Sequence, residues 1–406
     1  MSTDADIVTD LGALRGAMVD RLRDRGVLRD PRVEAAMRAV PRHLFVPGVP
    51  AERAYSGDSV VTHRDDQGVA VSSVSEAAIV AVMLQQLSVA PGGRILEIGA
   101  GTGYNAALLA ELAGPSGTVT SIDIDAVVTD EAAQRLEQAG YGRVRVACRD
   151  GAEGFAEAAP FTGIIVTAGA WDLPRPWQDQ LAPGGRLVAP LRIRGLTRSV
   201  ALHREDDGHW RSDSMHECGF MPIRGLDAMA ERNIQLGGDS GVFLRTDEGL
   251  DADAAVLGAA LDGPPSLQWT GVVTRTVENM DLWLSALDGF CRMVVTGKAI
   301  ERGLVRPIYP WGSMAVAGTD GFAYLLQRPA GSDEDGKALI ELGACGYGPG
   351  GQELASAVAG QVTTWERHRS SLSDLWVEVH PAGAGALPGA MITAAKRNST
   401  VLVRAE

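Results

Sequence analysis

Three glycines spaced two residues apart stand at the centre of the chemistry that this sequence can support. Gly99, Gly101 and Gly103 follow Glu97 in the stretch EIGAGTG, and Asp123 comes 24 residues after the first of them (123 minus 99). Glycine allows positive φ and lets the backbone approach a ligand closely at a helix N-terminus. An acidic residue at that distance is placed to accept hydrogen bonds from the hydroxyls of a ribose. The stretch therefore predicts a site for a nucleotide-derived cofactor.

The elements that must position these residues are a strand, a turn, a helix and a second strand. Residues 94–98 form a short apolar run typical of a buried parallel strand, and it ends at the glycines. Residues 105–113 are rich in Ala and Leu and predict a helix, which 114–117 (GPSG) end. Residues 118–122 predict the second strand. A third strand at 144–147 precedes Asp150 and Gly151.

The glycine spacing distinguishes two cofactor classes. A dinucleotide-binding fold uses G-x-G-x-x-G, whereas here the order is G-x-G-x-G, which begins two residues after a glutamate. This arrangement resembles motif I of the Rossmann-like methyltransferases that bind S-adenosylmethionine. The resemblance implies that Glu97 and the glycine backbone hold the amino-acid end of the cofactor. It also implies that Asp123 takes the ribose hydroxyls and that Asp150 and Gly151 lie against the adenine.

The segments before motif I extend this resemblance. The sequence contains VPRHLFVP at 40–47, Ala54-Tyr55, and a serine-rich turn, Ser72 to Ser75, before an apolar helix that runs to about residue 87. We expect an extended connector at 40–47, because two prolines bracket it, and Ser75 as the N-cap of the helix. The order of these segments resembles the protein-L-isoaspartate O-methyltransferase family.

The family resemblance assigns roles at the substrate end of the site. It implies that Ser75 lies where the methyl group meets the substrate carboxylate, and that Ser72 and Ser73 contact the cofactor. The family has proline where this chain has Ala77, and Gln or Ala where it has Glu76. These two departures bear on substrate preference.

Three further segments carry the same resemblance. Residues 161–169 match a family strand whose end, Val166, Thr167 and Ala168, faces the substrate. Residues 181–188 (LAPGGRLV) match a family hairpin, and 220–223 (FMPI) match a segment near the family's C-terminus. The resemblance spans about residues 10–225. It implies an α/β fold with a Rossmann-like S-adenosylmethionine-dependent methyltransferase domain.

Methyl transfer to a carboxylate needs few catalytic groups. The acceptor is already ionised at neutral pH, so no strong general base is required, and the rate must come from positioning. We therefore expect Ser75 to orient one carboxylate oxygen while the other attacks, with S-adenosylhomocysteine as the product. No G-x-S-x-G elbow surrounds Ser75, which argues against a serine hydrolase.

Composition excludes several other classes of protein. The formal net charge of -14 argues against nucleic acid or an anionic membrane as a partner. The four cysteines show no C-x-x-C spacing and the seven histidines no H-E-x-x-H spacing, so neither a metal site nor a disulfide framework is predicted. The acidic N-terminus is unlike a signal peptide, and we expect a cytoplasmic protein. Nothing in the sequence indicates the oligomeric state.

The length of 406 residues predicts more than one domain. We place a catalytic domain at 1–225 and a C-terminal α+β domain at 226–406. Five tryptophans in the latter suggest recognition of a peptide substrate: Trp269, Trp283, Trp311, Trp365 and Trp376. The sequence also resembles the branch of the family with an extra C-terminal domain that is associated with lanthipeptides, graspetides and lasso peptides.

Three functions follow from these observations. The first is methylation of an Asp side chain in a ribosomally made, modified peptide, where the ester cyclises to an aspartimide that can hydrolyse to isoaspartate. The second is methylation of L-isoaspartate in damaged proteins. The third is a module that binds S-adenosylmethionine without catalysis. In the first two functions the partner is a peptide or protein that bears an Asp or isoaspartyl carboxylate.

Overall fold

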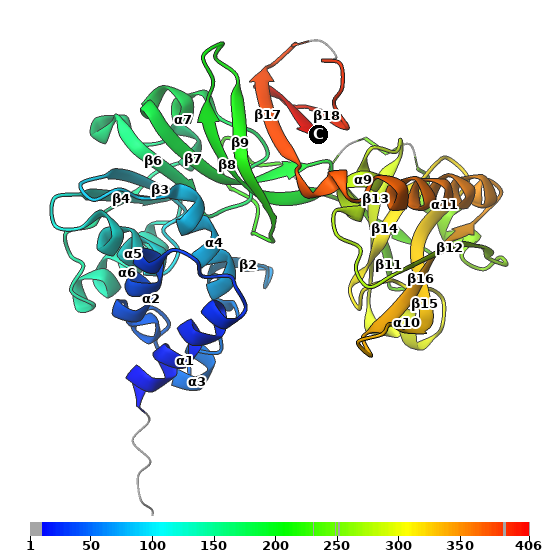
Figure 1. Cartoon of the computed structure of the whole chain (residues 1–406), viewed down its shortest axis with the longest axis horizontal. Helices are drawn as coiled ribbons and strands as arrows, with labels where there is room; N and C mark the ends of the chain where they lie inside the picture. The colour runs from blue at the N-terminus through cyan, green and yellow to red at the C-terminus, as the bar shows by residue number, and fades with distance from the viewer. Residues whose placement is uncertain (1–9, 230, 248, 251, 385–386, 406) are drawn as a thin grey trace, which may run out of the picture. The chain divides into compact units, whose positions relative to one another are not determined.

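The computed structural model describes residues 10–229, 231–247, 249–250, 252–384 and 387–405. The chain forms two compact units (Figure 1). The first comprises Met1–Leu191, Thr197–Ala228 and Lys396–Ser399. The second comprises Arg192–Leu196, Met229–Ala395 and Thr400–Glu406. A short segment near the C-terminus therefore belongs to the first unit.

The first unit is built on a mostly parallel sheet. Within this unit its strand order is β9-β8-β7-β6-β3-β4-β5. The strands are β3 (Arg94–Ile98), β4 (Thr118–Asp123), β5 (Arg145–Cys148), β6 (Phe161–Val166), β7 (Leu181–Ile193), β8 (Leu196–Arg204) and β9 (Trp210–Glu217). The chain runs outward from β3 to β5 and then returns to the other side of β3 as β6. Ligands bind at the carboxyl ends of the strands where the order reverses in this way.

Helices surround this sheet and complete a Rossmann-like fold, as the sequence predicts. They are α4 (Ala77–Leu87), α5 (Tyr104–Ala113), α6 (Ala126–Gln138) and α7 (Arg175–Gln180), with the short η2 (Gly151–Glu153) and η3 (Ala156–Ala158). The N-terminal part adds α1 (Leu11–Asp24), α2 (Pro31–Ala39), η1 (Arg42–Phe45), α3 (Ala51–Ala54) and the hairpin of β1 (Val60–Arg64) and β2 (Ala70–Val74). Helix α2 begins with Pro31 after Asp30, whose carboxylate accepts a hydrogen bond from the Arg32 amide at 2.7 Å.

Two local predictions in this region are wrong. Helix α4 has Glu76 as its N-cap, with no capping bond from the side chain, so Ser75 does not cap it. The connector at 40–47 is not fully extended, because η1 forms one helical turn within it. Phe45 in that turn is fully buried and packs edge-on against Tyr104, with 5.7 Å between the ring centres. Burial of Phe45 favours the turn over an extended chain.

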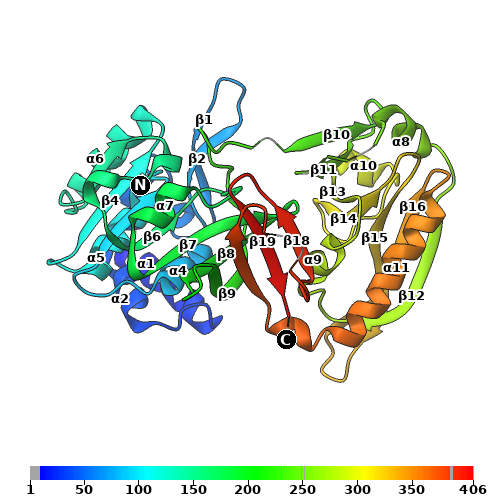
Figure 2. The same cartoon turned by 90° about the horizontal axis from the view of Figure 1, so that it is seen from above.

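The second unit contains an antiparallel sheet with the order β10-β11-β13-β14-β15-β16-β12. Its strands are β10 (Arg232–Leu236), β11 (Val242–Thr246), β12 (Ser266–Thr274), β13 (Phe290–Val295), β14 (Gly312–Ala317), β15 (Phe322–Ser332) and β16 (Ala338–Tyr347). Its helices are α8 (Ala254–Ala260), α9 (Met280–Ser285), α10 (Gly297–Glu301) and α11 (Gly351–His368). Helix α11 packs along β12, β15 and β16 (Figure 2). This mixture of helix and strand agrees with the predicted α+β class.

The apolar pattern of residues 281–290 (DLWLSALDGF) is typical of an amphipathic helix, but the helix that forms is shorter. Helix α9 ends at Ser285, and Phe290 begins β13 after Gly289, which has φ +72. A Cβ at Gly289 would collide with the carbonyl oxygen of Ala317. The helical pattern therefore ends where close strand pairing requires glycine.

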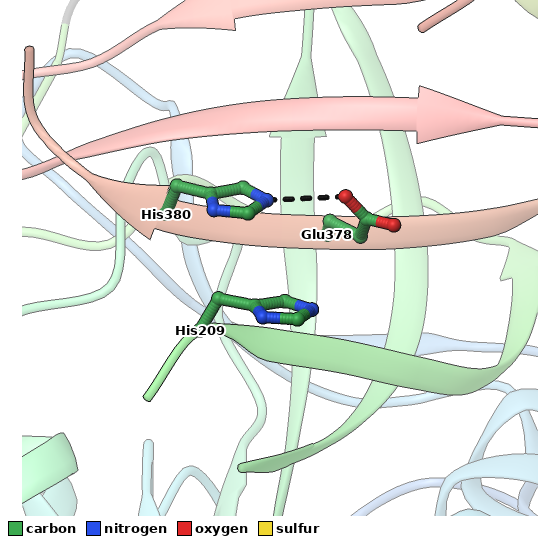
Figure 3. A group of neighbouring side chains, drawn as sticks. All are labelled: His209, Glu378 and His380. Atoms are coloured by element: carbon green, nitrogen blue, oxygen red, sulfur yellow. Dashed lines mark hydrogen bonds and ion pairs between the residues drawn. The ribbon is translucent and has the colours of Figure 1, made fainter. Parts of the chain in front are cut away.

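The end of the chain adds η4 (Ser371–Ser373), β17 (Trp376–Pro381), β18 (Ile392–Ala395) and β19 (Ser399–Arg404). In β17 the Glu378 carboxylate lies 3.1 Å from His380 Nε2 (Figure 3). Arg404 Nε lies 2.8 Å from the same carboxylate. Burial alone would raise the pKa of Glu378, but the hydrogen bonds from Arg404, Trp376 and His380 lower it to about 2.

Candidate functional site

A cavity of about 490 Å³ lies in the first unit, where the carboxyl ends of β3, β4 and β6 meet. Ten of the residues predicted from the sequence line it. They are Ser72, Ser73, Ser75, Glu97, Gly99, Gly101, Asp123, Gly151, Thr167 and Ala168. Residues from five separate parts of the chain therefore meet at one cavity.

Three predicted residues support the wall of this cavity without lining it. Gly103 is the N-cap of α5 with φ +87, and a Cβ there would press on Leu136 Cγ at 3.1 Å. Val166 is fully buried in β6. Asp150 accepts hydrogen bonds from the amides of Ala152 at 2.9 Å and Leu226 at 2.8 Å. Both carboxylate oxygens of Asp150 are thus used to hold the backbone beside Gly151.

The glycine turn is packed tightly against the end of β6. Gly99 has φ +105, and a Cβ at this position would lie 2.5 Å from Thr167 Oγ1. The Thr167 hydroxyl donates to the carbonyl oxygen of Gly99 at 2.6 Å. The Gly101 amide in turn donates to Asp123 Oδ2 at 3.2 Å. The turn therefore presents backbone to the cavity, and no other residue type fits at Gly99 without displacing Thr167.

Glu97 is the most deeply buried acidic residue of the site. It has no exposed surface and accepts hydrogen bonds from Asn105 Nδ2 at 2.8 Å and Ser121 Oγ at 2.5 Å. Burial raises its pKa to about 7, although the bonds from Ser121 and Asn105 oppose the shift. Sequence reasoning identified Glu97 but missed both partners. Asn105 could have been noticed in the sequence, because it is a polar residue in the first turn of an otherwise apolar helix.

Ser75 lies between β2 and α4, and its side chain lines the cavity. Its hydroxyl has no hydrogen-bond partner among the residues that the structure describes. Its carbonyl oxygen accepts a hydrogen bond of 2.7 Å from Arg42 Nη2. Nearby, Ser72 is buried and its hydroxyl accepts from Thr62 Oγ1 at 3.1 Å. Unlike Ser72, Ser75 therefore has a hydroxyl that is free to bind a ligand.

Two arginines at the site were not predicted from the sequence. Arg42 is fully buried behind Ser75. Arg224 lines the cavity, with its guanidinium 3.7 Å from Asp123 and 3.6 Å from Asp125. The motif VPRHLFVP contains Arg42, but a sequence cannot show that this side chain turns inward.

The segment 217–224 closes one side of the cavity. The Gly169 amide donates to the carbonyl of Met221 at 2.7 Å, and the Ile223 amide donates to the carbonyl of Gly169 at 2.9 Å. These bonds hold the segment beside the end of β6. Burial raises the pKa of the Cys218 thiol to about 12, so Cys218 is not a nucleophile at neutral pH.

Comparison with known proteins now identifies this arrangement. Residues 14–228 match the family model described as protein-L-isoaspartate(D-aspartate) O-methyltransferase. The chain belongs to this family. The family consists of S-adenosylmethionine-dependent carboxyl methyltransferases, which confirms the cofactor and the class of enzyme predicted from the sequence.

Curated relatives match the first half of the chain. A protein-L-isoaspartate O-methyltransferase of Methanopyrus kandleri is 37% identical over 218 residues, which cover 53% of this chain and 94% of that protein. One of Methanospirillum hungatei is 41% identical over 206 residues, which cover 51% of this chain and 90% of that protein. These relatives therefore leave most of the second unit unmatched.

A solved structure entitled protein-L-isoaspartate O-methyltransferase matches more of the chain. It covers 90% of this chain and 96% of its own, with a TM-score of 0.50 and 21% identity. At this identity the match shows the fold alone. Within the described part of this chain, every helix is too short or too polar to cross a bilayer.

The cavity suits the cofactor of the family. Gly99 and Gly101 present backbone to it, and Asp123 places a carboxylate at the end of β4. Glu97, together with Asn105, adds buried polar groups beside them. Backbone, carboxylate and amide together provide the hydrogen-bonding groups that a nucleoside and an amino acid require.

Proposed function

We propose that this chain methylates the carboxylate of an L-isoaspartyl residue in a peptide or protein. The observation that carries the proposal is the unpartnered Ser75 hydroxyl in the same cavity as the glycine turn. The names of the relatives support this choice of acceptor. Glu97, Gly99, Gly101 and Asp123 would hold the cofactor, and Ser75 with the backbone of Thr167 and Ala168 would hold the acceptor.

The residues of the chain perform a positioning task. S-adenosylmethionine supplies an electrophilic methyl group when it is bound. The acceptor carboxylate is already ionised, so the chain does not need to remove a proton from it. The Ser75 hydroxyl donates a hydrogen bond to one carboxylate oxygen and leaves the other free to attack. Orientation of the reacting groups and exclusion of water then account for most of the rate.

The proposal is tested by mass spectrometry of peptides incubated with the full-length protein and S-adenosylmethionine. Two peptides should be compared, identical except that one contains L-isoaspartate and the other aspartate. We expect a gain of about 14 Da, one methylene equivalent, only on the isoaspartyl peptide. Ser75→Ala should lower kcat by about 100-fold to 1,000-fold, the loss that follows removal of one oxyanion-hole donor in other enzymes. Ser116→Ala is the control, because Ser116 is exposed in the turn after α5.

A second candidate function is methylation of an Asp side chain in a ribosomally made, modified peptide. Glu76, which lines the cavity, and its neighbour Ala77 depart from the family next to Ser75, which favours an unusual acceptor. The ester carbonyl would be attacked by the next backbone amide nitrogen, and methanol would leave. The resulting aspartimide could then add water to give isoaspartate. The second unit alone does not favour this candidate, because the fold of a solved structure entitled protein-L-isoaspartate O-methyltransferase covers 90% of the chain.

The same measurement separates the candidates when a cyclised peptide precursor is added as a third substrate. Methylation and loss of methanol only on a cyclised peptide precursor would support the second candidate over the first. Binding of the cofactor without methyl transfer to either peptide would instead support a non-catalytic module.

We also propose that the second unit, predicted as residues 226–406, binds the peptide part of the substrate. In this unit Trp311 is 46% exposed and stacks on Tyr309 with 5.1 Å between ring centres. Exposed, ordered aromatic residues are favoured at binding surfaces. Trp311→Ala should raise KM for the peptide and leave cofactor affinity unchanged. Leu267→Ala is the control, because Leu267 is also an exposed apolar side chain of this unit.

A further inference from the structure

Arg42 is a buried cation whose hydrogen bonds all go to backbone carbonyls. Its side chain has no exposed surface. Its Nε donates to Ala54 at 3.0 Å, and its Nη2 donates to Asp58 at 3.1 Å and Ser75 at 2.7 Å. Each acceptor is a carbonyl oxygen of the main chain. Arg42 thereby joins α3, the start of β1 and the turn that carries Ser75.

The charge of Arg42 is not neutralised by a carboxylate. Among the described residues no acidic side chain lies within ion-pair distance of it, and the carboxylate of Asp58 is paired with Arg53. Burial lowers the pKa of Arg42, but an arginine remains charged at neutral pH. Its Cζ lies 4.9 Å from the ring centre of Tyr104, which lines the cavity. Buried charges in proteins are normally paired, so this arrangement requires an explanation.

The cavity wall has few groups that could attract an anion. Its acidic lining residues are Glu76, Glu97, Asp123 and Glu217. Its basic lining residue, Arg224, faces Asp123 and Asp125. A carboxylate that approaches Ser75 would therefore meet a wall of predominantly negative charge, unless a positive charge lies behind that wall.

We propose that Arg42 is a positioning residue for the methyl acceptor. Its guanidinium fixes the backbone of Ser75 and gives the acceptor carboxylate the positive potential that the cavity wall lacks. This inference rests on the proposed function, because it takes a carboxylate bound at Ser75 as its premise. It adds a determinant of substrate binding that lies outside the cavity and acts through Ser75.

The expected effect follows from the distance involved. A carboxylate bound at the Ser75 hydroxyl would lie about 8 Å from the guanidinium of Arg42. At this distance, a charged acceptor should bind about 2-fold more tightly than a neutral one if the effective dielectric constant is about 80, and about 30-fold more tightly if it is about 20. Water does not reach Arg42, so salt should screen this preference only weakly. An attraction from exposed charges would instead disappear at high ionic strength.

The test measures binding of two peptides to the full-length protein by calorimetry, in the presence of S-adenosylhomocysteine so that no turnover occurs. One peptide carries L-isoaspartate, and the other carries the neutral isoasparagine at the same position. Their ratio of Kd values reports the charge preference alone. A purely structural role of Arg42 would weaken binding of both peptides equally and leave the ratio unchanged.

We expect Arg42→Met to reduce this ratio to near 1, and Arg42→Lys to keep most of it, because lysine retains the charge. Lysine cannot reach all three carbonyls, so kcat should still fall in Arg42→Lys. Arg21→Met is the matched control. Like Arg42, Arg21 donates to a backbone carbonyl, in this case that of Tyr55 at 2.7 Å, but Arg21 is exposed. It should leave the ratio unchanged.

Four outcomes would overturn the inference. The first is an unchanged ratio in Arg42→Met. The second is loss of the preference for the charged peptide in the unaltered protein at 0.5 M salt, where the Debye length is about 4 Å. This measurement needs no variant, so it does not depend on the folding of Arg42→Met. The third is failure of the unaltered protein to bind either peptide, which would also overturn the proposed function. The fourth is binding of both peptides with equal affinity, which would overturn the role of Arg42 and leave the proposed function standing.

Discussion

Replacement of Glu97 by glutamine should change how the stability of the first unit depends on pH. Burial raises the pKa of Glu97 to about 7 from the ordinary value of 4.5 for a glutamate side chain. A carboxyl group with a raised pKa stabilises the folded state at low pH, when it is protonated. That stability is lost as the pH rises from about 4.5 through 7, because the unfolded chain releases the proton more easily. Glutamine does not titrate, and so Glu97→Gln should not show this loss.

The magnitude follows from the two pKa values. With 1.36 kcal/mol for each pKa unit, the unaltered protein should lose about 2–3 kcal/mol of unfolding free energy between pH 5 and pH 8, relative to Glu97→Gln. Glu97 is fully buried, so solvent does not screen this effect. The glutamine amide can still form hydrogen bonds with Asn105 and Ser121, which keeps the packing of the variant close to that of the original.

The assay is urea unfolding of the unaltered protein and of Glu97→Gln at pH 5, 6, 7 and 8. At each pH, the unfolding free energy of one protein is subtracted from that of the other. Other titrating groups are common to both proteins and cancel in this difference. Glu137→Gln is the control, because Glu137 is exposed on α6 and should show a constant difference. A difference for Glu97→Gln that does not change with pH would refute the reasoning about burial.

Two further predictions concern packing. Gly99→Ala should weaken S-adenosylmethionine binding at least 10-fold in calorimetry, because its Cβ would displace Thr167. The control is Gly140→Ala, which should leave binding unchanged, because Gly140 also has a positive φ but has open space where a Cβ would lie. Truncation after residue 225 should lower the melting temperature of the first unit, because the buried Asp172 then loses the hydrogen bonds from the amide of Asn398 and the hydroxyl of Ser399. The loss of these partners should cost about 1–3 kcal/mol, and a fully stable truncated protein would contradict it.

The sequence was informative where function depends on local backbone. Gly99 and Gly101 directly follow one strand and Asp123 ends the next strand along the chain, so their spacing alone predicts that they meet. Ser75 was also found, but by family resemblance instead of by capping, since Glu76 is the N-cap of α4. The predicted parallel strands were recognisable because each is a short apolar run that ends at a polar or glycine residue.

The features that the sequence did not reveal depend on contacts between distant segments. Arg42 reaches Ser75 across 33 residues, and Asn398 reaches Asp172 across 226 residues. Side chains such as Ser121 are polar residues inside buried strands, and their partners become visible only when the strands are placed side by side. No periodicity or spacing in the chain encodes which of many polar residues will meet.

The return of residues 396–399 to the first unit also affects how the second unit can be studied. Removal of everything after residue 225 would combine loss of the second unit with loss of structural contacts in the first. A point substitution such as Trp311→Ala avoids this problem, because it leaves residues 396–399 in place.

The most direct test of the central claim is methyl transfer by the full-length protein to an L-isoaspartyl peptide, followed by mass spectrometry. We expect a gain of about 14 Da on that peptide, none on the matched aspartyl peptide, and a large loss of rate in Ser75→Ala. If the protein binds S-adenosylmethionine but the mass of the isoaspartyl peptide does not change, the proposed methyl transfer is contradicted.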